Sequence, residues 1–310
     1  MTGVKDRVKQ GLDEIRTVVL GVQILLGFQY EAVFQPGFQR SSLLARQLEA
    51  VGLGLLAVSL IALITAIAFN RLAEGGGMTA RQEDLNEAVV AVALAPFAAT
   101  LAFDVFVALE RELGRMLAAA IGTLLAAVAL AFWYGGAVLR PKSGATSDRK
   151  DEPVSLKDRI GALLTASRIV LPGAQALPGF QLAAYLTDGY QRTPFDARIA
   201  HAAGLVLLIV AMILLVAPAA FHRLAERGED TPRAERVCAI LVLAGMAPLG
   251  LAISADLYVV CRLVDATRPA ALAAAACAAL VSGAAWYVFP LSIRATRVRD
   301  RRRRPGESAA

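Results

Sequence analysis

Apolar residues in this chain are gathered into long blocks that are separated by short charged segments. Each block runs for roughly 18 to 25 residues, the length that a helix needs to cross about 30 Å of hydrocarbon. The blocks are continuous and rich in Ala and Leu, whereas strands of membrane barrels alternate over about ten residues. We therefore predict an all-α integral membrane bundle of eight transmembrane helices, approximately at residues 17–34, 48–70, 87–108, 114–139, 168–187, 199–221, 236–261 and 270–291.

The chain repeats itself at an offset of 152 residues. Residues Gly21–Gln29 return as Gly173–Gln181, and Phe69–Glu74 return as Phe221–Glu226. Over 89 aligned positions that begin at Arg16, about 36 are identical, which is several times the chance expectation and indicates a duplicated, fused unit. We predict two four-helix repeats, in residues 1–140 and 141–310, the second preceded by a polar linker.

The distribution of Lys and Arg predicts the orientation of the bundle. Of 32 such residues, 24 fall at the termini, in the linker and in the loops that share their side, and 8 fall in the opposite loops. Because positive charge near span ends is retained in the cytoplasm, both termini are expected there, in a bacterial inner membrane. Each unit has an even number of spans, so the two units should be parallel, related by rotation about an axis along the membrane normal.

Composition agrees with a membrane protein and offers little for catalysis. The chain is 57% apolar with a mean hydropathy of +0.56. Three cysteines and two histidines show no metal-ligand or disulfide spacing, and no nucleotide-binding or hydrolase motif is present. We expect no enzymatic activity, no metal, no cofactor and no nucleic-acid partner.

Several polar side chains nevertheless fall inside the predicted spans, in equivalent positions of the two repeats. The candidates are Gln23, Gln29 and Asp104, with their counterparts Gln175, Gln181 and Asp256. Such residues normally turn toward protein or water, either to join helices or to form an ion path, and both interpretations are open. Asp104 lies roughly 24 Å from the predicted cytoplasmic start of its helix. This places it level with the outer loop, so we expect ion pairs with the arginines there.

Charged residues near the span ends form a second candidate set, which comprises Arg40, Arg46, Arg71, Arg192, Arg198, His222 and Arg223. Arg71 and Arg223 end the second span of each unit, where they would meet the negative end of the helix dipole and the anionic inner leaflet. His222 is expected to be a polar helix terminator rather than a proton carrier.

Three further features carry structural expectations. Pro172 and Pro178 should bend or break the fifth span, because each removes a backbone donor. The polar residues 1–15 should form a short helix on the membrane surface. The Ala-rich fourth and eighth spans allow close helix contact, which could serve either the interface between the two units or a homo-oligomer.

Each unit resembles a family of small bacterial four-span membrane proteins of unknown function. The resemblance rests on Gly21–Phe28, which match a GVQxLxxF-like first span, and on Ala217–Leu224, which match an APxAxHR-like end of the second span. It implies a tandem member of that family with no assigned role. Some relatives are labelled sodium:proton antiporter. Asn70 departs from the pattern, which has His at this position, so the resemblance implies an imidazole in the second unit alone.

Three functions are therefore in competition. The first is a non-enzymatic multi-pass membrane protein of unknown role, in which the intramembrane polar residues join the helices. The second is a small cation or proton transporter that uses the same residues. The third is a membrane scaffold whose basic tail, Arg294–Arg304, binds anionic lipid or an acidic protein.

Overall fold

The computed structural model describes residues 3–139 and 155–303, and these form helices and connecting turns with no strand. The first unit contains α1 (Val4–Ala32), α2 (Pro36–Gln39), α3 (Leu43–Leu72), α4 (Ala80–Leu113) and α5 (Arg115–Leu139). The second contains α6 (Leu156–Tyr185), α7 (Asp188–Arg192), α8 (Phe195–Ala220) with the π-helical turn η1 (Phe221–Ala225), α9 (Pro232–Leu263), and α10 (Arg268–Gly283), which continues through η2 (Ala284–Val288) into α11 (Phe289–Arg303). The all-α prediction is confirmed. The predicted linker falls mostly outside the described residues.

The ends of the helices are set by local sequence that the two units share. Thr79 caps α4 by accepting a hydrogen bond from the backbone N–H of Gln82, and Thr231 caps α9 by accepting one from Ala234. Thr is a favoured N-cap because its hydroxyl satisfies one of the free N–H groups of the first turn. The repeated threonines therefore start the third long helix at the same place in each unit.

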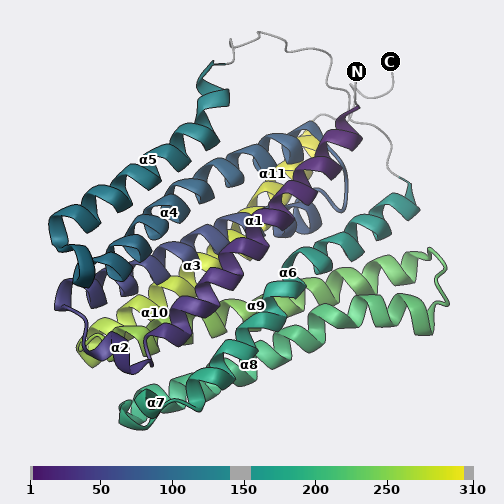
Figure 1. The fold of residues 1–310 in the computed structure, drawn as a ribbon. Coiled ribbons are helices and arrows are strands. Elements are labelled where there is room, and N and C mark those ends of the chain that lie inside the picture. Colours follow the sequence, from purple (N-terminus) through teal and green to yellow (C-terminus); the bar gives the residue numbers. More distant parts are fainter. Residues whose placement is uncertain (1–2, 140–154, 304–310) are drawn as a thin grey trace.

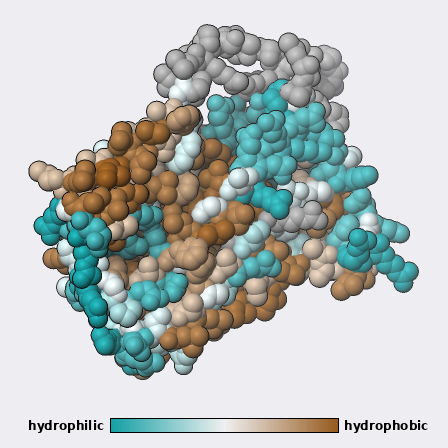
Figure 2. Space-filling view, viewed as in Figure 1, coloured by the Kyte–Doolittle hydropathy of each residue, from teal (hydrophilic) through white to brown (hydrophobic). Residues whose placement is uncertain are grey.

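Seven helical segments of the described chain are long and apolar enough to cross a membrane: α3, α4, α5, α6, α8 with η1, α9, and α10 to Arg297 of α11. These mark a multi-pass membrane protein, and Figure 2 shows hydrophobic residues over the middle of the bundle with hydrophilic residues toward its two ends. The remaining predicted span, the first one at residues 17–34, corresponds to α1, which is not among the seven.

The prediction of a short surface helix at the N-terminus was wrong. Residues from Val4 onward belong to one continuous helix of 29 residues, whose apolar stripe is buried in the bundle from its first turn. The basic residues of that turn bind protein side chains: Lys5 Nζ lies 2.7 Å from Asp158 Oδ2, and Arg7 Nε lies 2.7 Å from Glu83 Oε1. Helix α1 therefore enters the bundle directly because both its apolar and its charged faces find protein partners.

Helices α1 and α6, the equivalent first helices of the two units, run side by side in the same direction (Figure 1). Near one end Lys5 binds Asp158, and farther along Gln23 Nε2 donates to the Val170 carbonyl at 3.3 Å. Toward the other end the rings of Phe28 and Phe180 lie 4.5 Å apart. The α1–α6 contact is therefore the seam along which the units join.

Helix α6 is continuous through Pro172 and Pro178, so of the two expected outcomes the break does not occur, and the bend stays a prediction. A proline removes one backbone donor and disturbs one turn. Here the flanking turns remain helical because α1, α8 and α9 pack along α6.

The fourth and eighth spans occupy different places in the bundle. Helix α5 packs mainly on α4, and leaves Met116 90% and Phe132 82% exposed. The α10–α11 segment instead reaches the first unit, where Trp286 Nε1 donates to the Ile61 carbonyl at 2.9 Å. The eighth span is therefore part of the interface between units, and α5 has an apolar face turned to its surroundings.

Candidate functional site

Two equivalent hydrogen-bonded pairs of an amide and a carboxylate lie inside the bundle. Gln29 on α1 donates through Nε2 to Asp104 Oδ1 on α4. Gln181 on α6 donates in the same way to Asp256 Oδ1 on α9, at 2.6 Å. The structure thus brings together four of the six intramembrane candidates, and each pair joins the first long helix of its unit to the third.

A small residue on the second long helix completes each site. A Cβ atom added to Gly52 on α3 would lie 3.5 Å from Gln29 Nε2, and one added to Gly204 on α8 would lie 3.2 Å from Asp256 Oδ1. Glycine at these repeated positions lets the helix backbone approach the polar pair closely. Three helices of each unit therefore converge on its amide and carboxylate.

The expected ion pairs between these carboxylates and the loop arginines were wrong, since neither Asp104 nor Asp256 has one within residues 3–139 and 155–303. Arg46 instead reaches the second unit, where its Nη2 lies 2.8 Å from the Leu263 carbonyl and 2.9 Å from Asp265. The end of α9 attracts this guanidinium because helix C-termini carry partial negative charge. Arg198 lies over the ring of Phe195.

The other two outer arginines, Arg40 and Arg192, are exposed and line a cavity of about 470 Å³ between α2, α7 and the end of α9. They occupy equivalent positions in the two units and face this outer cavity. The carboxylates face inward, toward the amides of α1 and α6. This difference in direction explains why a shared depth along the helices did not produce ion pairs.

The second site contains a histidine that the sequence analysis overlooked. His201 on α8 is 1% exposed, and its Nδ1 lies 2.7 Å from the hydroxyl of Tyr30, which belongs to α1 of the first unit. The same hydroxyl lies beside the carboxylate of Asp256. His201 Nε2 is buried and has no hydrogen-bond partner in the described structure. Tyr30, His201, Gln181 and Asp256 therefore form one polar cluster that spans both units.

Aromatic rings enclose this cluster. The centroid of the His201 ring lies 5.8 Å from that of Tyr30, 5.7 Å from that of Phe34 and 5.1 Å from that of Tyr190. Tyr190 belongs to the short helix α7, and burial raises the pKa of its phenol. Tyr30 and Phe34 belong to the first unit and Tyr190 to the second, so both units contribute to these aromatic surroundings.

The first site has different chemistry at the matching position. In the alignment of the two repeats, Glu49 of α3 is equivalent to His201 of α8. Glu49 is 6% exposed and makes no ion pair in the described residues. Glu49 lies close enough to Asp104 for their charges to interact. The offset was the signal that could have identified both residues, since it aligns one ionisable side chain with another at the same helical position.

Buried acceptor atoms without partners accompany both pairs. Oε1 of Gln29 and Oε1 of Gln181 are buried and accept no hydrogen bond within the described residues. Each site therefore offers a carboxylate and a free amide oxygen, with Asp256 buried and Asp104 partly exposed. No group of three or more His, Cys, Asp and Glu side chains that could hold a metal ion occurs in the part of the chain that the structure describes. This chemistry suits a proton or a small monovalent cation.

The remaining candidates lie apart from the two sites. Gln23 binds the Val170 carbonyl of α6, whereas its counterpart Gln175 is exposed. His222 Nε2 lies 3.5 Å from Asp230 Oδ1 in the turn after η1. Arg71 is buried, whereas its counterpart Arg223 is exposed.

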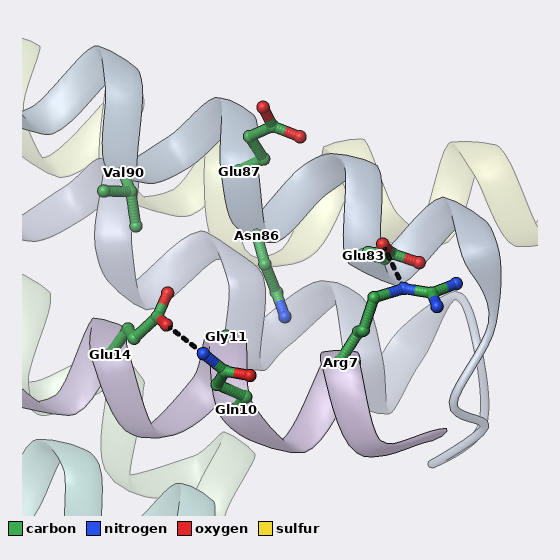
Figure 3. Close-up of a pocket in the computed structure, with 8 residues that line it drawn as sticks. All are labelled: Arg7, Gln10, Gly11, Glu14, Glu83, Asn86, Glu87 and Val90. Carbon is green, nitrogen blue, oxygen red and sulfur yellow. Dashed lines mark hydrogen bonds and ion pairs between the residues drawn. The ribbon is translucent and has the colours of Figure 1, made fainter. Parts of the chain in front are cut away.

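A groove of about 300 Å³ lies between α1 and α4, toward the N-terminal ends of both helices (Figure 3). Glu14, Glu83 and Glu87 line it, and Arg7 binds Glu83 while Gln10 binds Glu14 at 2.9 Å. These internal pairs occupy two of its three carboxylates. The groove lies several helical turns from Asp104 along α4, so it forms no part of the first site.

Comparison with known proteins supports the duplication. A search of curated proteins and a search of solved structures each returned no match. The model of a family described as a family of unknown function (DUF6328) matches the chain twice, at residues 5–137 and at residues 153–290. The two matches together cover most of the chain, and each covers one repeat. The chain therefore belongs to this family of unknown function, as a tandem duplication of its unit.

Proposed function

We propose that this protein is an eight-span protein of the bacterial inner membrane that binds and moves protons or a small monovalent cation through its two amide–carboxylate sites. The observation that carries this proposal is the surroundings of Asp256. Its side chain is 4% exposed, and the groups beside it are the Gln181 amide and the Tyr30 hydroxyl, which are neutral.

An ionised carboxylate in such surroundings is stabilised by a bound positive charge. An isolated ionised carboxylate in the protein interior is costly unless it is paired, and acidic residues within membrane spans commonly mark ion paths. One hydrogen bond from an amide offsets only part of that cost. A bound proton would remove the charge, and a bound cation would balance it with the free Gln181 Oε1 as a second ligand.

The competing function is structural, and the same hydrogen bonds favour it. Gln29–Asp104 and Gln181–Asp256 each join two helices, and interhelical hydrogen bonds in membrane proteins contribute about 0.6 kcal/mol on average. The two functions differ in whether they need an ionisable group. Asn in place of Asp can still accept the hydrogen bond from glutamine, but it cannot take up or release a proton.

The deciding experiment measures the decay of an imposed pH gradient in proteoliposomes that contain the purified protein and a trapped pH-sensitive dye. The wild type is compared with the double variant Asp104→Asn and Asp256→Asn. The matched control is Glu112→Gln, which removes an exposed carboxylate from the same helix as Asp104. We expect the wild type and the control to dissipate the gradient, and the double variant to resemble empty liposomes. In a second set of proteoliposomes a gradient of a monovalent cation is imposed, to test whether the protein moves the cation instead of protons.

Equal rates for the wild type, the double variant and empty liposomes in both sets would reject transport. Unfolding midpoints in detergent supply the second readout. If the double variant retains the wild-type midpoint and all transport rates equal those of empty liposomes, the hydrogen bonds are structural and the charge has no role.

A further inference from the structure

A further polar site lies at the C-terminal end of α3, away from Glu49 and the amide–carboxylate pairs. The ends of α3, α6 and α9 meet there. A cavity of about 300 Å³ occurs there, lined by residues of both units that include Arg71, Leu163, Glu235 and Arg236. Arg71 lies 22 positions after Glu49 on α3, or about 33 Å along the helix. The cavity is therefore separate from the amide–carboxylate sites.

The guanidinium of Arg71 is buried and lacks an acidic partner. The residue is 8% exposed, so more than nine-tenths of its surface is covered. Nη1 makes a long contact of 3.5 Å with the Arg159 carbonyl, and Nε is buried with no hydrogen-bond partner. Arg71 forms no ion pair with any carboxylate in residues 3–139 and 155–303. A charge in this state is costly unless something else neutralises it.

The nearby acids are engaged by other cations. Glu235 lies 3.2 Å from Arg159 Nε, and Glu74 lies 2.7 Å from Arg297 Nη1. Glu235 attracts Arg71 through its charge but makes no ion pair with it, so Arg71, Arg159 and Arg236 outnumber the acids around the cavity. Such an arrangement favours an anion that accepts several hydrogen bonds at once.

The equivalent position in the second unit lacks this arrangement. Arg223 has the same place in the repeat, yet it is exposed and lines none of the cavities described above. Interaction with a helix dipole would apply equally to both arginines, so it does not account for the burial of Arg71. The glycine turn after the helix does not account for it either, because Gly76 (φ 81°) beside Arg71 and Gly228 (φ 84°) beside Arg223 adopt the same conformation. The burial of Arg71 comes from the residues of α6 and α9 that line the cavity with it.

We propose that the cavity at Arg71 binds a phosphate group carrying negative charge, as presented by an anionic phospholipid of the adjacent leaflet. A phosphate supplies oxygens for the free Nε and Nη donors of Arg71 and for the guanidinium of Arg236 at the rim. Basic pockets between membrane helices on the cytoplasmic side are suited to lipid head groups. The site is assembled from both units, so lipid bound there would also hold the units together.

The test compares thermal unfolding midpoints of the full-length protein in a neutral detergent. The additions are dihexanoyl phosphatidylglycerol, dihexanoyl phosphatidylcholine and inorganic phosphate, each titrated separately. We expect phosphatidylglycerol to raise the midpoint of the wild type and phosphatidylcholine to have no such effect. A rise with inorganic phosphate as well would show that the phosphate group suffices, and a rise with phosphatidylglycerol alone would show that the lipid is required.

Arg71→Gln should weaken the response to phosphatidylglycerol by about tenfold in the concentration needed, because a charged hydrogen bond contributes about 1.5–3 kcal/mol. Arg223→Gln, the matched control in the other unit, should respond as the wild type does. If Arg71→Gln does not fold, Arg236→Gln at the exposed rim replaces it, with a weaker response expected. The proposal is overturned if neither anion stabilises the wild type, if both lipids act equally, or if the variants that fold respond as the wild type does.

Discussion

At the residue scale, the two units retain the amide and the carboxylate but differ in the side chains around them. Position 49 is Glu in the first unit, and the equivalent position 201 is His in the second. Tyr30 likewise corresponds to Leu182, so the hydroxyl that serves the second site comes from the first unit. The first site therefore has two carboxylates, whereas the second combines a carboxylate with an imidazole and a phenol. Duplication has produced two chemically different sites.

The hydrogen bond between Tyr30 and His201 should contribute measurably to stability. Tyr30→Phe removes the hydroxyl and leaves His201 Nδ1 buried without its partner, so the free energy of unfolding should fall by about 1–3 kcal/mol. Tyr185→Phe is the control because Tyr185 is 52% exposed. Unfolding in detergent measures both variants. An unchanged midpoint for Tyr30→Phe would show that His201 is satisfied in another way.

The pairing of Gln181 with Asp256 should also be detectable by substitution. Gln181→Leu removes the donor and leaves the carboxylate of Asp256 without its amide, so this variant should be less stable than the wild type. Gln175→Leu is the control, since Gln175 is an exposed glutamine on the same helix. Equal unfolding midpoints for the two variants would contradict a role for the Gln181 amide.

At the element scale, the packing of α5 on α4 depends on a close approach of the two backbones. A Cβ atom on Gly122 would lie 2.6 Å from the Ala102 carbonyl oxygen, closer than normal packing permits. The ring of Trp133 stacks on that of Phe97 farther along the same contact. Since α5 packs mainly on α4, this contact contributes most to holding the fourth span in place.

Gly122→Ala should therefore destabilise the protein, by about 1–3 kcal/mol, because the added methyl group overpacks a close contact. Gly135→Ala is the matched control, as a Cβ at Gly135 on the same helix meets nothing within 4 Å. Both variants gain the same helix propensity, so the difference between their unfolding midpoints isolates the clash. Equal midpoints would mean that α5 shifts without cost.

At the scale of the whole molecule, polar contacts tie the units together at both ends of the bundle. Lys5 binds Asp158 near the N-terminal ends of α1 and α6, and Arg297 binds Glu74 where α11 meets the turn after α3. Arg46 reaches the end of α9 at the opposite end. Both ends of the described chain lie at one end of the bundle (Figure 1). This arrangement suits eight spans, with α1 as the polar central one.

Cysteine labelling should establish whether α1 crosses the membrane. In a background without Cys238, Cys261 and Cys277, Ser41→Cys places a thiol in the turn after α2. We expect a membrane-impermeant maleimide to label this thiol in intact cells, because an eight-span topology puts that turn outside. A reporter fused at residue 150 should show cytoplasmic activity. Protection of the thiol until the cells are broken would reduce the count to seven.

The sequence by itself determined the helices, the duplication and the polar residues of the two pairs. These features are local or periodic: block length predicts a span, and a constant offset aligns Gln29 with Gln181 and Asp104 with Asp256. Even so, the two prolines left open whether the fifth span bends or breaks, and α6 is unbroken where the neighbouring helices pack along it.

Only the tertiary structure decided which partner each polar group would find. Arg46 and Asp104 share a depth, but depth leaves direction around the helix open, and Arg46 turned to the end of α9 instead. Tyr30 and His201 lie 171 positions apart in different units, so no local pattern links them. Arg71 and Arg223 occupy equivalent positions before the same Leu-Ala-Glu sequence, and only Arg71 is covered by the other unit. The repeated sequence places equivalent residues at equivalent positions of the two units, but each of them faces a different part of the other unit.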